Sequence, residues 1–204
     1  MITILDYGSG NINALKNIYD RLNISIEFAK TKEHILSADH IILPGVGAFD
    51  ETVSTLHENG FIDVLNKKVL GEKVPILGIC VGMQMLAHSS EEGILKGLSW
   101  IPGKVRKFDI NMIPDKPKIP HLGWNSIVTM RDCVLFKDID PETGFYFMHS
   151  YYFECADENN VIAKTEYGRT FHSAVNYENI YGVQFHPEKS HDNGIQLLRN
   201  FANL

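Results

Sequence analysis

One cysteine in this sequence is placed to act as a nucleophile. Cys80 lies in the run Gly78-Ile-Cys-Val-Gly82, between an apolar stretch and a segment, residues 83–88, with the spacing of an amphipathic helix. A tight turn from a strand into a helix forms a nucleophile elbow, and glycines permit the close backbone approach that such a turn requires. The unpaired N–H groups of the helix amino terminus would stabilise a thiolate there.

A base and a carboxylate that could orient it lie near the end of the chain. In Gly182-Val-Gln-Phe-His186-Pro-Glu188 an apolar strand leads to an imidazole and a carboxylate two residues apart. Side chains two apart on an extended backbone point the same way, so Glu188 can hold one ring nitrogen of His186 while the other faces a thiol. An isolated cysteine is more often a buried structural residue, and a His beside a Glu is more often a solvated surface pair, but the two motifs together indicate catalysis.

The first half of the chain alternates between strands and helices. Periodic apolar residues predict a helix over residues 12–22 and helical structure through Val64, Leu65 and Leu70. Before, between and after these helices, short apolar runs predict the buried strands of a parallel sheet at residues 2–5, 24–28, 39–45 and 75–80.

The pattern changes after about residue 100. Runs at residues 104–108, 145–153 and 161–165, separated by turns, predict antiparallel strands, and Ile195, Leu198 and Phe201 predict a closing helix. We therefore expect a single domain over residues 1–204. Its predicted fold is α/β and doubly wound, with a mixed, mostly parallel sheet, an antiparallel C-terminal portion and helices on both faces.

Composition excludes several classes of protein. With 44% hydrophobic and 22% charged residues the chain is typical of globular proteins, and a net charge of −6 disfavours binding to nucleic acid or to an anionic membrane. We find no secretory signal or membrane-spanning run, which favours a cytoplasmic protein. Three widely spaced cysteines give neither a disulfide framework nor a metal cluster, and no H-E-x-x-H run is present, so we expect no metal and no cofactor.

The elbow Gly78-Ile-Cys-Val-Gly-Met-Gln84, paired with His186-Pro-Glu188, resembles the class I glutamine amidotransferases. The resemblance narrows to the glutaminase subunits of imidazole glycerol phosphate synthases. It is carried by motifs that span nearly the whole chain: Asp6-Tyr-Gly-Ser-Gly-Asn11, Pro44-Gly-Val-Gly-Ala-Phe49, His121-Leu-Gly-Trp-Asn125, Phe145-Tyr-Phe-Met-His-Ser-Tyr151 and residues 182–190.

The resemblance implies that Cys80 attacks the carboxamide of glutamine to form a thioester, which water hydrolyses to glutamate. His186 would protonate the departing ammonia, and Glu188 would fix its tautomer. Candidate oxyanion donors are the N–H of Val81 and one N–H from the loop Gly45-Val46-Gly47, which we expect to be a mobile switch.

Similar enzymes hold the glutamine headgroup with residues that match Gln84 and Glu92 and with the backbone of His149, Ser150 and Tyr151. The neighbouring Glu91 is a rival to Glu92, and residues 89–92 are also compatible with a solvated turn.

The resemblance further implies a partner, because free ammonia needs a protected path to an acceptor enzyme. That partner is a (β/α)₈ cyclase subunit, bound as a heterodimer, which would use the ammonia in histidine biosynthesis. Asn11, Trp124, Tyr146 and Lys189 match interface positions, although Trp124 is also compatible with core packing.

Three alternatives share parts of this pattern. A glutaminase for anthranilate, aminodeoxychorismate, guanylate or pyridoxal phosphate synthesis would use the same triad. A non-catalytic regulatory subunit would keep the fold, but the intact triad disfavours it. A cysteine hydrolase that acts alone is disfavoured by Gln84 and Tyr151.

Overall fold

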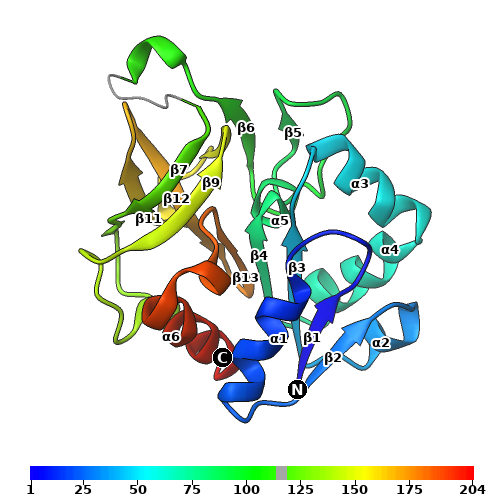
Figure 1. Ribbon diagram of the computed structural model, residues 1–204. Coiled ribbons are helices and arrows are strands. Elements are labelled where there is room, and N and C mark those ends of the chain that lie inside the picture. The colour runs from blue at the N-terminus through cyan, green and yellow to red at the C-terminus, as the bar shows by residue number, and fades with distance from the viewer. Residues whose placement is uncertain (114–118) are drawn as a thin grey trace.

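The computed structural model describes residues 1–113 and 119–204 (Figure 1). Its strands are β1 (Ile2–Leu5), β2 (Ile26–Ala29), β3 (His40–Gly45), β4 (Ile76–Cys80), β5 (Ser89–Ser90), β6 (Gly103–Lys107), β7 (His121–Asn125), β8 (Val128–Thr129), β9 (Phe145–His149), β10 (Tyr151–Cys155), β11 (Val161–Glu166), β12 (Thr170–Tyr177) and β13 (Ile180–Val183). Its α-helices are α1 (Ile12–Arg21), α2 (Lys32–Leu36), α3 (Phe49–Glu58), α4 (Phe61–Asn66), α5 (Val81–Gln84) and α6 (His191–Ala202).

Shorter helical segments join these elements. A π-helical turn, Lys67–Gly71, continues α4, and 3₁₀ turns occupy Ile110–Met112, Val134–Phe136, Glu158–Asn160 and Pro187–Lys189. Within the described residues, no helix combines the length and the apolar character that a membrane crossing requires.

The predicted parallel sheet is confirmed. Five strands lie in the order β2-β1-β3-β4-β13, and every neighbouring pair among them is parallel. Strands β1 and β4 are buried along their whole length because helices cover both faces, which explains why their sequences are apolar without alternation.

The helices divide between the two faces of this sheet. The chain moves from β1 to β2 in one direction and then back across β1 to β3 and β4, so right-handed crossovers place α1 on one face and α2, α3 and α4 on the other. The final helix α6 packs beside α1, whereas α4 contacts both α2 and α3 (Figure 1). The expected closing helix is therefore present and covers the face of α1.

The antiparallel C-terminal portion is also confirmed, with one correction. Strands β12, β10 and β6 extend the sheet beyond β13 in antiparallel pairs, and β11 pairs with β12. The single strand predicted over residues 145–153 is wrong. The chain breaks at Ser150, so that β9 pairs with β7 in a separate two-stranded sheet while β10 joins the main sheet.

The helix predicted after Cys80 is much shorter than its sequence pattern suggests. α5 ends at Gln84, and residues 81–87 are all buried, so the pattern of residues 83–88 does not describe a helix with one solvent-facing side. The chain then turns, and backbone hydrogen bonds from residues 98–101 satisfy the carbonyls of Met85, Leu86 and Ala87.

Glycines bring the backbones of β3, β4 and α5 into direct contact. A Cβ atom on Gly82 would lie 1.9 Å from the carbonyl oxygen of Leu43, and one on Gly45 would lie 2.3 Å from the backbone nitrogen of Gly82. A Cβ atom on Gly78 would lie 2.6 Å from the carbonyl oxygen of Gly82. No side chain fits between these segments, so the turn that carries Cys80 is held by main-chain packing.

This packing predicts that Gly82→Ala destabilises the fold strongly, because the new methyl group meets backbone rather than a movable side chain. We expect the free energy of unfolding in urea to fall by about 2–3 kcal/mol or more. Gly71→Ala is the control, since its Cβ atom would meet nothing within 4 Å and should change the free energy by less than ~1 kcal/mol. Equal effects of the two substitutions would contradict this account.

Candidate active site

The parallel sheet brings the ends of three strands to one edge. Gly45 at the end of β3 pairs with Cys80 at the end of β4, and Val183 at the end of β13 pairs with Ile79. The chain continues from β13 through residue 184 to His186. The carboxyl edge of a parallel sheet is where α/β proteins place their sites, and here it gathers both catalytic motifs predicted from the sequence.

The backbone of Cys80 adopts a strained conformation. Its φ of 55° and ψ of −111° lie outside the regions that an L-residue normally occupies, as expected for a nucleophile elbow. The side chain is 4% exposed. Its Sγ lies 3.7 Å from Nε2 of Gln184, which donates to it, and 4.0 Å from the carbonyl oxygen of Met148.

His186 and Glu188 form the predicted pair. Nδ1 of His186 lies 2.8 Å from Oε1 of Glu188, and both side chains are almost fully buried. Nε2 of His186 has no hydrogen-bond partner within the part of the chain that the structure describes, and the imidazole lines the same pocket as Cys80. The ring is thus oriented through one nitrogen while the other remains available to a reacting group.

The electrostatics of His186 favour its protonated form. Burial by itself lowers the pKa of His186, but the neighbouring Cys80 and Glu188 outweigh this effect and raise the pKa to about 10. An imidazolium between a sulfur and a carboxylate can supply a proton to a leaving group, which is what an acid in amide cleavage must do.

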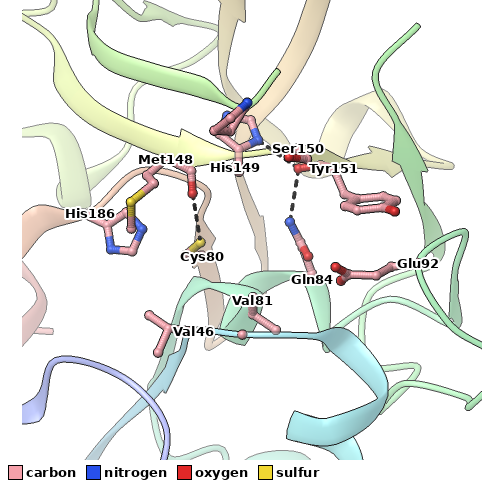
Figure 2. Close-up of a pocket in the computed structure, with 12 residues that line it drawn as sticks. Val46, Cys80, Val81, Gln84, Glu92, Met148, His149, Ser150, Tyr151 and His186 are labelled. Atoms are coloured by element: carbon pink, nitrogen blue, oxygen red, sulfur yellow. Dashed lines mark hydrogen bonds between the residues drawn. The ribbon is translucent and has the colours of Figure 1, made fainter. Parts of the chain in front are cut away.

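The pocket collects all five residues predicted to bind substrate. Figure 2 shows Cys80 between His186 on one side and Gln84 with Glu92 on the other, while residues 148–151 and the residues Val46 and Val81 close it from opposite directions. Its lining residues are Val46, Gly47, Cys80, Val81, Gln84, Glu92, Pro120, Met148, His149, Ser150, Tyr151 and His186. Gly45 and Glu188 lie just behind this lining.

The structure distinguishes the two rival carboxylates. Glu92 lines the pocket and accepts a hydrogen bond from the backbone N–H of Phe49 at the start of α3, 3.0 Å away, and burial raises its pKa. Glu91 is exposed and pairs instead with Arg106 and with the backbone of Lys107. Of these two glutamates, Glu92 is the one that can contact a ligand in this pocket.

Sequence reasoning overlooked Gln184, which is fully buried beside the nucleophile. Besides donating to Cys80, its Oε1 accepts a hydrogen bond from Nε2 of Gln84 at 3.1 Å, and Gln84 also donates to the carbonyl oxygen of Tyr151 at 3.0 Å. The signal was its position two residues before His186, where an extended chain directs both side chains to the same side.

The loop predicted to form part of an oxyanion hole makes a specific contact. The N–H of Val46 donates to Oγ of Ser9 at 2.9 Å, and the same hydroxyl donates to the carbonyl oxygen of Val46 at 2.8 Å. The amide is therefore directed to Ser9. Gly47 has a φ of 100°, which glycine adopts without strain and which lets the loop turn away here.

The four residues predicted to contact a partner all have accessible side chains. Trp124 on β7 is 45% exposed, with its ring near His191, which excludes the core-packing alternative for this residue. Asn11 and Lys189 are exposed, and Nζ of Lys189 lies over the ring of the half-buried Tyr146, 5.8 Å from its centroid.

Two buried histidines lie side by side here, His149 in the lining of the pocket and His121 outside that lining. His121 on β7 faces His149 on β9, and Nδ1 of His121 lies 3.0 Å from Nε2 of His149. Burial lowers the pKa of His121 to about 4, and burial together with the neighbouring His121 lowers the pKa of His149 to about 3. Both rings are therefore neutral near pH 7.

Comparison with known families identifies the class. The family model described as glutamine amidotransferase class-I matches residues 3–204. This chain therefore belongs to the class I glutamine amidotransferases.

Individual relatives with full-length similarity carry a more specific name than the family model does. The chain is 50% identical over 204 residues to the imidazole glycerol phosphate synthase subunit HisH of Leptospira interrogans, covering 100% of both chains. It is 48% identical over 201 residues to the subunit HisH 2 of Methanococcus maripaludis, covering 98% of each.

Solved structures of other proteins share the fold. A glutamine amidotransferase from Thermotoga maritima gives a TM-score of 0.66 at 17% identity, covering 99% of this chain and 82% of that one. The structure of PurLQS from Thermotoga maritima gives 0.70 at 15% identity, covering 99% and 97%. At these identities the likeness concerns the fold alone.

The neutral histidine pair predicts a loss of stability in acid. Because the folded-state pKa of His121 lies below its unfolded value of 6.5, its contribution to stability is complete above pH 6.5 and is lost as the pH falls toward about 4. Because His121 takes up a proton more readily in the unfolded chain, the free energy of unfolding should fall by roughly 2 kcal/mol between pH 6.5 and about pH 5. We expect urea unfolding of His121→Asn to depend less steeply on pH than unfolding of the unsubstituted protein, and parallel curves would contradict this.

Proposed function

We propose that this chain is the glutaminase subunit of an imidazole glycerol phosphate synthase. It would hydrolyse glutamine to glutamate and ammonia, and the ammonia would serve histidine biosynthesis. One observation carries the proposal: Cys80, the pair His186 and Glu188, and the amide of Gln84 meet at one pocket. The names of relatives with 48–50% identity over nearly the whole chain support this synthase rather than another amidotransferase.

The position of each group supports a thiol mechanism. Sγ of Cys80 attacks the side-chain carbonyl carbon of glutamine and forms a tetrahedral oxyanion. His186, held by Glu188, gives its proton to the departing ammonia, which leaves a thioester on Cys80. His186 then takes a proton from water, which attacks the thioester and releases glutamate and the free thiol.

The oxyanion needs N–H donors. The amide of Val81 begins α5 directly after the nucleophile, as in other elbows of this type. We propose that Gly45, Val46 and Gly47 supply the second donor once the peptide of Val46 turns away from Ser9 and toward Cys80. The loop would thus act as a switch, because in the conformation observed its amide is held by a hydroxyl.

The pocket has an end suited to the amino-acid headgroup of glutamine. With the carboxamide at Cys80, the headgroup would extend toward Gln84 and Glu92 (Figure 2). The carboxylate of Glu92 would pair with the substrate ammonium, and the backbone of His149, Ser150 and Tyr151 would hold the substrate carboxylate. The two N–H bonds of Gln84 are already used, so its oxygen is the atom left to accept from substrate.

The partner is inferred from the subunit names of the relatives and from the surface. A (β/α)₈ cyclase subunit would bind as a heterodimer over Asn11, Trp124, Tyr146 and Lys189, and it would receive the ammonia through a protected path. Exposed aromatic and cationic side chains are typical of interface anchors. The free thiols of Cys80, Cys133 and Cys155 are consistent with the reducing cytoplasm, which we propose as its location.

Glutamate release from glutamine tests the proposal directly. We expect the purified chain to hydrolyse glutamine slowly alone and much faster with the cyclase and its ribotide substrate. Cys80→Ala should lower the rate at least about 10³-fold, because no other group can replace the nucleophile. Cys133→Ala is the control and should keep full activity. Absence of hydrolysis in every mixture would overturn the assignment.

The two neighbouring glutamates give a matched test of substrate binding. Glu92→Gln removes the charge that would pair with the substrate ammonium, so the KM for glutamine should rise about 10- to 100-fold. Glu91→Gln makes the same change outside the pocket and should leave KM within about twofold. Both values would be measured from initial rates in the activated complex, and equal effects would remove Glu92 from the binding site.

A further inference from the structure

A continuous series of hydrogen bonds runs through the interior behind the pocket. Nδ2 of Asn125 lies 2.9 Å from the carbonyl oxygen of Glu166 and 3.2 Å from Nε2 of His121. Nδ1 of His121 lies 3.0 Å from Nε2 of His149, and Nδ1 of His149 lies 2.7 Å from the carbonyl oxygen of Tyr151.

The two carbonyls at its ends determine the direction of every proton in this series. The carbonyl of Tyr151 can only accept, so Nδ1 of His149 donates and its Nε2 accepts in the neutral ring. Nδ1 of His121 must then donate, and its Nε2 accepts from Asn125. The carbonyl of Glu166 independently requires the amide nitrogen of Asn125 at that point. Both ends therefore select the same arrangement, with each imidazole in the Nδ1–H form.

The series continues to the nucleophile on the other side of Tyr151. The carbonyl of Tyr151 also accepts from Gln84, whose second N–H goes to Gln184, which in turn donates to Cys80. The carbonyl of Tyr151 is thus held between an imidazole and an amide, next to the backbone that faces the headgroup end of the pocket. The orientation of this carbonyl therefore determines the position of the Gln84 amide that donates to it.

The end of the series that is farther from Cys80 lies in β7, whose inward and outward faces carry different kinds of side chain. In β7, His121 and Asn125 point inward to the hydrogen-bond series, whereas Leu122 and Trp124 are 50% and 45% exposed. The same five-residue strand therefore presents an apolar surface outside and the start of the series inside.

We propose that His121 and Asn125 are positioning residues for glutamine binding. They would set the tautomer of His149 and, through the carbonyl of Tyr151, hold the peptide at Ser150 and Tyr151 and the amide of Gln84 in place for the substrate. The inference rests on the proposed glutaminase function. It adds a role for β7, which makes no direct contact with the pocket.

A matched pair of substitutions tests this role. His121→Asn keeps an amide N–H close to the position of Nδ1 and can still donate to His149, whereas His121→Leu has nearly the same shape and cannot. Both lose the stacking of His121 on Phe147 and Tyr167, so that loss is common to the pair. A buried acceptor without a donor is expected to cost about tenfold in binding.

We expect the KM for glutamine to rise about tenfold in His121→Leu and less than about threefold in His121→Asn, with kcat changing less than KM. Asn125→Leu, at a half-buried position, should raise KM in the same direction and serves if His121→Leu does not fold. Equal KM values for His121→Leu and His121→Asn, or an unchanged KM in Asn125→Leu, would overturn the proposal.

Nitrogen-15 NMR of the histidine rings gives a readout that does not depend on activity. The unsubstituted protein should show His121 and His149 as neutral Nδ1–H tautomers, and His121→Asn should retain this form at His149. An Nε2–H form of His149 in the unsubstituted protein would overturn the proposal even if the enzyme is active. Correct tautomers in a chain that never hydrolyses glutamine would instead refute the proposed function.

Discussion

Main-chain packing at the ends of β3 and β4 is the constraint on which this site depends. Gly45 and Gly82 bring the loop after β3 into backbone contact with the turn after β4, and Cys80 between them takes a conformation with positive φ. A non-glycine residue in that region is strained, so the surrounding structure must hold it there. The buried pair of His186 and Glu188 then needs only one extended segment after β13 to reach the thiol.

The three histidines near the pocket differ in protonation state because their surroundings differ. Cys80 and Glu188 raise the pKa of His186 and favour its charged form, whereas burial lowers the pKa values of His121 and His149 and favours their neutral forms. Three imidazoles in one region thus have two different tasks. In the proposed mechanism His186 carries a proton to the reacting atoms, whereas His121 and His149 make directional hydrogen bonds that a change of protonation would break.

Much of this arrangement could be predicted from sequence because the decisive residues are local. The strands of the parallel sheet, the closing helix and the candidate triad follow from apolar runs and from the short motifs around Cys80 and His186. Three features could not be predicted. The break at Ser150 and the short α5 depend on tertiary contacts that override periodicity, and the network through Gln184 joins segments about 100 residues apart. The resemblance favoured Glu92 over its rival Glu91, and the structure adds that Glu92 lines the pocket whereas Glu91 does not.

The exposed face of β7 has a consequence for how the protein must be produced. The side chains of Leu122 and Trp124 are about half exposed. Exposed apolar side chains on one strand favour self-association when nothing covers them. A cell that synthesises this chain with nothing bound over β7 would carry copies with a bare apolar strand. If the proposed cyclase subunit binds over β7, synthesis of the two chains in balanced amounts would keep that strand covered.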